Sequence, residues 1–346
     1  MRKNQIQWFT LITVMSLMVV AAGCGSSSKA SIDSQASADQ QANVTKVRIG
    51  LDTAGNGSPQ YRVAKEEGFF KKYGIEAETS DFAYGIDTIN AMLVGRTDAG
   101  IAADYAMLNS LGKGNMSIVA TISRSTPESA KRSFLLVNDS IQTEQDIKGK
   151  RLGVPRATVG EYVWFKYLEK LGINDKDVTF VNYTSPDEAI VAARKGDIDA
   201  IWASGDLLAK LEKIETLRKL VDGTANNHFV RAYFLVQTEY VKDNPDVVGR
   251  ILQALDESTS YTVEHPDVTA DILYKSIKIP KESTLRNMEA TGLVLGFSQE
   301  DYDHLKKMYD WLIDRGILDS SLYKLEEKIN IDPLKKVLPD AVSYQP

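Results

Sequence analysis

The sequence contains very few residues that could form disulfides or bind metals. Cys24 is the only cysteine among 346 residues, so no disulfide can form within one chain. Its three histidines, His228, His265 and His304, are scattered, and none has a second histidine at metal-ligand spacing. These absences argue against a zinc site. We expect the protein to hold neither a metal nor a cofactor.

Several signatures of enzymes and of nucleic-acid binding are also missing. The chain contains no Gly-x-x-x-x-Gly-Lys-Ser/Thr phosphate loop and no Gly-x-Ser-x-Gly nucleophile motif. The pair Gly55 and Gly57 continues to Gln60 where a dinucleotide site would have a third glycine. The formal net charge is −6, with no basic cluster, which argues against a nucleic-acid partner. We therefore expect no enzyme.

Long apolar runs are absent except near the N-terminus. Arg2 and Lys3 precede an uncharged apolar stretch over 8–22, which is shorter than the ~20 residues that a membrane crossing needs. This pattern is typical of a secretion signal, and we assign it to residues 1–23. The small residues before Cys24 resemble a bacterial lipobox, which implies a lipid on the cysteine sulfur.

The segment 24–45 is rich in Ser, Ala, Gln and Asp and has too few large apolar residues to fold alone. We interpret it as a flexible tether. The folded part would then be anchored to the cell membrane by lipid only, on the extracytoplasmic face.

The remaining chain contains a repeat. GRTDAGIAADY begins at Gly95 and GDIDAIWASGD begins at Gly196, and they share the pattern Gly-x-x-Asp-Ala-x-x-Ala. Before each lies a short β-branched run, VRIGLDT from Val47 and RLGVP from Arg151, followed by a helical pattern that ends at a Gly-Ile pair. The order β-α-β-α-β is therefore predicted twice.

Such alternation predicts an α/β protein with two doubly wound parallel-sheet lobes. Ligands of these sheets bind outside the carboxyl ends of the strands, so two facing lobes would form a cleft. The aspartates of the repeat, Asp98 and Asp199, precede the strands. We therefore assign them a structural role.

Two similar apolar segments, SFLLVND and RAYFLVQTEY, are interpreted as the paired crossings between the lobes, a two-strand hinge. This interpretation gives lobe I as 46–137 plus 233–346 and lobe II as 138–232.

Several segments resemble the aliphatic sulfonate, taurine and nitrate substrate-binding proteins of ABC importers. They include EEGFFKKYGIEAE, AMLVGRTDAGIAADYA, DIKGKRLGVPRATVGEYV and EYVKDNPDVVGRILQAL. The resemblance implies the type II periplasmic binding protein fold. It also implies a monomer that captures a small-molecule ligand by hinge closure and presents it to the transmembrane subunits of an ABC permease.

The resemblance and the predicted strand ends together select a set of ligand-binding candidates. They are Asn56, Gly57, Ser58, Tyr84, Asp104, Tyr105, Thr158, Glu161, Ser204 and Asp206. Hydroxyls, main-chain N–H groups and helix N-termini in this set suit an oxyanion such as a sulfonate. Thr158 and Glu161 also match a capping box.

The sequence departs from the family at two of these positions. Taurine-type members commonly have histidine where Glu161 stands, and a Trp-x-Pro segment where Ser204-Gly205-Asp206 stands. Asp104, Glu161 and Asp206, with Asp52 as a possible fourth, would place carboxylates near the cleft. Like charges about 4 Å apart repel by roughly 1 kcal/mol in water and by more in a buried site. An amine or a nitrogen heterocycle such as a thiamine pyrimidine precursor therefore stays open as the ligand, as does a sensor lobe without transport.

Three arginines could offset these carboxylates. Arg156 is adjacent to the predicted helix start near Thr158 and is the candidate anion partner. Arg124 and Arg231 are expected at the surface near the crossings.

Overall fold

The computed structural model describes residues 44–54, 56–226, 229–288 and 291–345. Cys24, the predicted signal segment and the tether up to residue 43 lie outside the described residues. Within those ranges, no helix has both the length and the apolar character that a membrane crossing requires.

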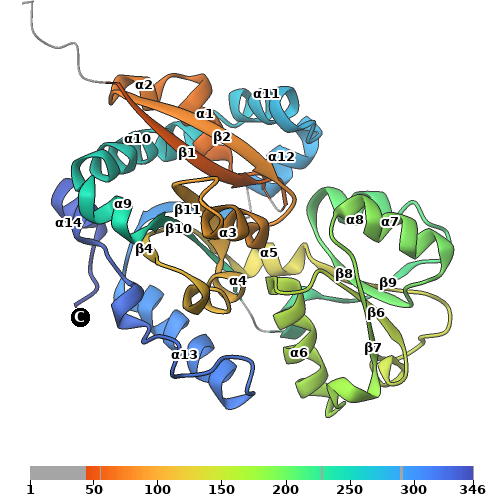
Figure 1. Cartoon of the computed structure of the whole chain (residues 1–346). Coiled ribbons are helices and arrows are strands. Elements are labelled where there is room, and N and C mark those ends of the chain that lie inside the picture. The colour runs from red at the N-terminus through yellow and green to blue at the C-terminus, as the bar shows by residue number, and fades with distance from the viewer. Residues whose placement is uncertain (1–43, 55, 227–228, 289–290, 346) are drawn as a thin grey trace, which may run out of the picture. The chain divides into compact units, whose positions relative to one another are not determined.

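Strands from both ends of the described chain form the first sheet, which belongs to lobe I (Figure 1). In spatial order its strands are β11 (Thr291–Gly296), β4 (Met116–Ser125), β10 (Arg231–Gln237), β3 (Ala99–Ala103), β1 (Thr45–Asp52) and β2 (Ile75–Phe82). Strand β1 is parallel to β2 and β3, whereas β10 is antiparallel to β3 and β4.

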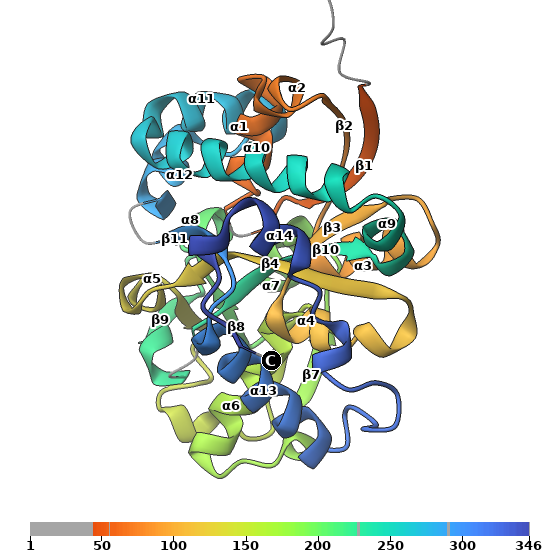
Figure 2. The same cartoon turned by 90° about the vertical axis from the view of Figure 1, so that its left-hand side faces the viewer.

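Helices surround this sheet, and most of them follow β10 in the chain. They are α1 (Pro59–Glu66), α2 (Phe69–Lys72), α3 (Gly85–Leu93), α4 (Asp104–Leu108), α9 (Thr238–Asp243), α10 (Pro245–Glu264), α11 (Pro266–Ile277), α12 (Lys281–Met288), α13 (Gln299–Asp314) and α14 (Asp332–Val337). Helix α10 buries an apolar stripe that includes Val248, Ile251, Leu252 and Leu255, and it runs beside α1, α2 and α14 (Figure 2).

The second sheet contains the middle of the chain. Its strands, in spatial order, are β7 (Thr179–Asn182), β6 (Arg151–Val154), β8 (Ala200–Ala203), β5 (Phe134–Val137) and β9 (Arg218–Asp222). The helices of this lobe II are α6 (Val159–Leu171), α7 (Pro186–Lys195) and α8 (Gly205–Leu211), and α5 (Pro127–Lys131) precedes β5.

Successive side chains of β5 in the second sheet pack against the helices on opposite faces of that sheet. Leu135 and Val137 join a core with α6, whereas Leu136 between them joins a core with α7 and α8. This is the two-residue period of a strand that is buried on both faces. Helices therefore cover both sides of this sheet, as predicted for a doubly wound lobe.

Both sheets are mixed, although the sequence analysis expected parallel ones. In each sheet, the strand that comes directly after the chain enters that lobe from the other one runs against its neighbours: β5 is antiparallel to β8 and β9, and β10 is antiparallel to β3 and β4. In the first sheet the edge strand β11 is also antiparallel to β4. The strand 134–137, which the sequence analysis counted with lobe I, hydrogen-bonds only to strands of lobe II among the described pairings. The chain thus leaves the first sheet at the end of β4, before residue 134.

The repeated aspartates hold the starts of equivalent strands. Asp98 accepts hydrogen bonds from the backbone N–H of Arg48 (2.9 Å) and from its Nε (3.1 Å). Asp199 accepts the same two bonds from Arg151, at 2.8 and 3.1 Å. Both aspartates therefore have the structural role predicted for them, and the repeat extends to side-chain contacts.

Candidate functional site

A cleft of about 930 Å³ lies among the carboxyl ends of the strands, and both lobes contribute to its lining. A volume of this size suits a small-molecule ligand. The residues at the starts of α1, α3, α6, α7 and α8 all lie on the lining. Because the first N–H groups of a helix have no intrahelical partner, this arrangement offers hydrogen-bond donors and partial positive charge to a ligand.

The structure brings together six of the ten predicted ligand-binding residues. Asn56, Ser58, Tyr84, Thr158, Ser204 and Asp206 line the cleft. Gly57, Asp104, Tyr105 and Glu161 do not belong to the lining.

On the lobe I side, Ser58 holds the carboxyl group at the end of β1. Its hydroxyl donates to Asp52 Oδ1 at 2.9 Å, and Ser58 has a left-handed backbone with φ of 55°. Burial raises the pKa of Asp52 to about 6, against the opposing effects of the Ser58 hydrogen bond and the Arg62 charge. Asp52 is half-buried and thus places a carboxyl group on the cleft lining.

On the lobe II side, Thr158 caps helix α6 with its side chain. Its hydroxyl oxygen accepts from the N–H of Gly160 at 3.1 Å and donates to the carbonyl of Pro155 at 2.7 Å. Glu161 accepts from the N–H of Ala157 at 3.0 Å. Both predicted residues therefore cap the helix, but they do not form a standard capping box. In a capping box Thr158 would accept from the N–H of Glu161, and Glu161 from the N–H of Thr158. Here each donor is one residue earlier in the chain.

Glu161 also connects the two lobes. Its carboxylate is 8% exposed and accepts from the hydroxyl of Tyr105 in α4 at 3.2 Å, in addition to an ion pair with Arg156. Burial and the Glu161 charge raise the pKa of the Tyr105 hydroxyl. The predicted anion partner Arg156 is therefore engaged within lobe II, where its guanidinium also lies over the ring of Phe180.

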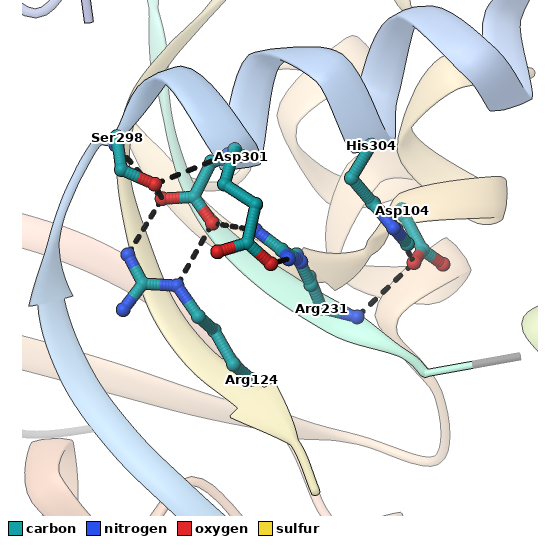
Figure 3. A network of polar contacts seen from close by, with 7 residues as sticks. Asp104, Arg124, Arg231, Ser298, Asp301 and His304 are labelled. Atoms are coloured by element: carbon teal, nitrogen blue, oxygen red, sulfur yellow. Dashed lines mark hydrogen bonds and ion pairs between the residues drawn. The ribbon is translucent and has the colours of Figure 1, made fainter.

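Asp104 lies in a buried polar network and does not line the cleft (Figure 3). It is fully buried and accepts from the N–H of Tyr105 (2.8 Å) and the N–H of Arg231 (3.0 Å), and His304 Nε2 is 2.7 Å from its carboxylate. Of the three predicted cleft carboxylates, Asp104 and Glu161 have partners inside the protein and Asp206 lines the cleft. Asp52, the possible fourth, also lines it, as do Asp81 and Asp187.

Two arginines expected at the surface belong to the same network. Asp301 in α13 is fully buried, receives two bonds from Arg124 and forms an ion pair with Arg231, whose residue exposure is 8% (Figure 3). Burial would raise the pKa of Asp301, but the Arg124 hydrogen bonds, the Ser298 N–H and both positive charges lower it to about 2. The prediction that Arg231 lies at the surface is therefore wrong. Arg231 can be buried because Asp301, 70 residues away in the chain, compensates its charge.

Asp206, Tyr84 and Ser204 are three more of the predicted residues that line the cleft. Asp206 forms an ion pair with Lys210 one helical turn later, at 2.8 Å. Tyr84 and Ser204 are the N-cap residues of α3 and α8, and burial raises the pKa of the Tyr84 hydroxyl.

The sequence analysis missed a group of hydroxyl residues that extends from the end of β4 to the start of β5. Ser123, Ser125, Ser129 and Ser133 all line the cleft, together with Arg132. The density of serines in SRSTPESAKRS is a usable signal, but the sequence analysis assigned ligand binding to no residue of this segment.

The two mixed sheets and the cleft between their strand ends define the chain as a two-lobed protein of the periplasmic binding protein fold. It belongs to the family described as NMT1/THI5 like, which matches residues 58–269.

Relatives and solved structures agree with this assignment. A Bacillus subtilis protein provisionally named an aliphatic sulfonates-binding protein is 28% identical over 338 residues, covering 92% of this chain and 97% of the relative. The taurine-binding periplasmic protein of Escherichia coli is 21% identical over 299 residues, covering 83% and 88%.

Among solved structures, the alkanesulfonate-binding protein SsuA from Xanthomonas axonopodis pv. citri, bound to MOPS, has a TM-score of 0.69 at 18% identity, covering 82% of this chain and 98% of that one. The desulfurization enzyme DSZB has a TM-score of 0.61 at 16% identity, covering 85% and 99%. The fold therefore hosts both binding proteins and an enzyme.

Proposed function

We propose that this protein is the extracytoplasmic solute-binding component of an ABC importer and that it captures a small sulfonate in the cleft between its lobes. The observation that carries the proposal is the convergence of helix N-termini from both lobes on a cleft of about 930 Å³. A sulfonate has three acceptor oxygens and one negative charge, which match the unpaired N–H groups and the positive end of a helix. The names of the sulfonate- and taurine-binding relatives support the same class of ligand.

The described contacts weaken the argument for a purely cationic ligand. Asp104 and Glu161 are absent from the cleft lining and are neutralised or hydrogen-bonded within the protein. Asp206 is paired with Lys210. Glu161 and Asp104 should therefore repel a sulfonate near Thr158 and Gly160 less than their positions in the sequence suggest.

The rest of the proposal concerns delivery. We propose that the lobes close around the ligand through the two chain segments that join them, one between β4 and β5 and one between β9 and β10, and that the closed monomer docks on a permease without performing catalysis. We also propose that a lipid on Cys24 anchors the chain, with residues 24–45 as the tether.

Isothermal titration calorimetry tests the ligand class. The protein should bind ethanesulfonate and should bind the neutral, similarly shaped ethyl methyl sulfone at least about tenfold more weakly, because only the sulfonate has a negative charge. Equal affinity for both compounds, or binding of neither, would count against a sulfonate ligand. Hydroxymethyl pyrimidine in the same series tests the heterocycle alternative.

A further inference from the structure

Two tyrosines of the cleft have hydroxyl groups without a partner in the protein. Tyr84 is the N-cap residue of α3 in lobe I, Tyr183 follows β7 in lobe II, and both line the cleft. Within the described residues, neither hydroxyl forms a hydrogen bond with another protein group. Tyr183 is only 5% exposed, so little of it reaches bulk water. A buried polar group normally has a partner, and these hydroxyls lack the one that a purely structural role would provide.

Other buried tyrosines show how this protein treats a hydroxyl that only stabilises the fold. Tyr105 and Tyr167 each donate to a glutamate, at 3.2 and 2.9 Å. Tyr61 and Tyr233 have no partner, but their hydroxyls are sealed from solvent and neither residue lines the cleft. Tyr183 differs from both groups, because its hydroxyl is unpartnered but not sealed and the residue lines the cleft.

The two tyrosines meet across the boundary between the lobes. The ring of Tyr84 packs against an apolar cluster of lobe II that contains Tyr183, Ile190 and Leu208. Burial, and after it the neighbouring Tyr84, raise the pKa of Tyr183 well above its usual range. Burial likewise raises the pKa of Tyr84. Both phenols therefore stay protonated in neutral solution and can donate hydrogen bonds.

The protein itself compensates the carboxylates near this pair. Asp87 accepts from the N–H of Tyr84 at 3.2 Å, and Glu188 accepts from the N–H and the hydroxyl of Thr184 at 2.7 and 2.8 Å. Asp87 lies in the first turn of α3, and Asp187 and Glu188 lie in the first turn of α7. The positive end of a helix stabilises negative charge at such positions. The two phenols are thus uncharged donors that remain available to a ligand at this point of the cleft.

We propose that the hydroxyls of Tyr84 and Tyr183 donate hydrogen bonds, one from each lobe, to the sulfonate group of the bound ligand. This inference rests on the proposed function and adds Tyr183 to the residues that recognise the ligand. The pair supplies two uncharged donors in addition to the N–H groups of the helix starts. Because the donors come from different lobes, a ligand that bonds to both stabilises the arrangement in which the lobes are together.

Calorimetry with ethanesulfonate on the full-length protein purified in detergent tests the pair. Tyr84→Phe and Tyr183→Phe each remove one hydroxyl and keep the ring, so the apolar cluster stays filled. Each variant should bind ethanesulfonate about ten- to hundredfold more weakly, the range expected of a hydrogen bond to a charged group. The matched control is Tyr167→Phe, whose hydroxyl bonds to Glu144 and which does not line the cleft. This variant should keep the wild-type affinity.

Thermal unfolding without ligand should rank the same variants in the opposite order. The two cleft variants lose no hydrogen bond within the protein and should keep the wild-type midpoint, whereas Tyr167→Phe loses a bond and should unfold at a lower temperature. A midpoint lowered in the cleft variants as in Tyr167→Phe would show that their hydroxyls have structural partners, and would overturn the inference.

The affinities separate this inference from the proposed function. Wild-type affinity in either cleft variant would overturn the pair and leave the sulfonate function intact. Failure of the wild-type protein to bind ethanesulfonate would overturn the proposed function together with the inference.

Discussion

The two lobes share one plan and differ where they face the ligand. In both, an arginine at the start of the first strand binds the aspartate of the Gly-x-x-Asp-Ala turn, and the strand that follows each crossing runs antiparallel to its neighbours. At the other end of the first strand, lobe I has Asp52 and lobe II has Pro155. The arginine–aspartate contacts, which stabilise the fold, are therefore the same in both lobes. The residues at the strand ends, which line the cleft, differ between the lobes.

A second difference lies in the buried charges. Lobe I contains the network of Arg124, Arg231 and Asp301, which has no counterpart in the described part of lobe II. This network links α13 to β4 and β10, and β10 is the strand by which the chain returns from lobe II. Lobe I therefore depends on an ion cluster where lobe II depends on apolar packing between α6 and its sheet.

The largest expected effect comes from breaking that network. Asp301→Asn leaves two arginines without their buried counter-charge and should lower the free energy of unfolding by about 3 kcal/mol or more. Urea unfolding measures this loss. Glu300→Gln is the matched control, since Glu300 pairs with the same Arg231 but its side chain is 82% exposed, and it should change stability little.

The acid dependence of the same variant gives a further check. The pKa of Asp301 is lowered to about 2, below its ordinary value of 3.8. Its contribution to stability is therefore fully present above pH 4 and is lost as the pH falls towards 2. The stability difference between wild type and Asp301→Asn should shrink over that interval. A difference that stayed constant with pH would contradict the ion-cluster account.

A smaller effect should distinguish the two repeated aspartates. Asp98→Ala and Asp199→Ala each remove hydrogen bonds to an arginine and should cost about 1 to 3 kcal/mol. Asp199 should cost more, because its side chain is 11% exposed against 17% and it also accepts from Asn138 at 2.9 Å. Thermal unfolding compares the two variants with Asp197→Ala, an exposed aspartate of the same turn. Equal stability of Asp199→Ala and Asp197→Ala would show that the repeat is not structural.

The smallest expected effect concerns the loops before α1 and α6. Ala157 has a left-handed backbone with φ of 57° and no side-chain bond to lose, so Ala157→Gly should stabilise the protein by up to about 1 kcal/mol. Ser58→Gly relieves the same strain in lobe I but removes the bond to Asp52, so its net effect should lie nearer zero. Denaturant midpoints compare both with Ala192→Gly within α7, which should destabilise by about 1 kcal/mol.

The repeat allowed the β-α-β-α-β order, the cleft at the strand ends and the structural aspartates to be predicted from sequence. These features depend on local patterns and on rules for parallel sheets. The antiparallel direction of β5 and β10 could not be predicted, because the apolar pattern of a buried strand does not indicate whether its neighbours run parallel or antiparallel to it. Asp104 was placed near the cleft for its position after a strand, but its partners Arg231 and His304 lie 127 and 200 residues away. Only the folded chain shows where such a side chain points.

The position of β10 has a consequence for how the chain folds as it is made. This strand lies between β3 and β4 in the middle of the first sheet, yet all of lobe II precedes it in the chain. The first lobe therefore cannot close its sheet until residue 237 has emerged, whereas the second lobe is complete by residue 222. During synthesis lobe II can therefore fold first, whereas lobe I can complete its sheet only after β10 has been made.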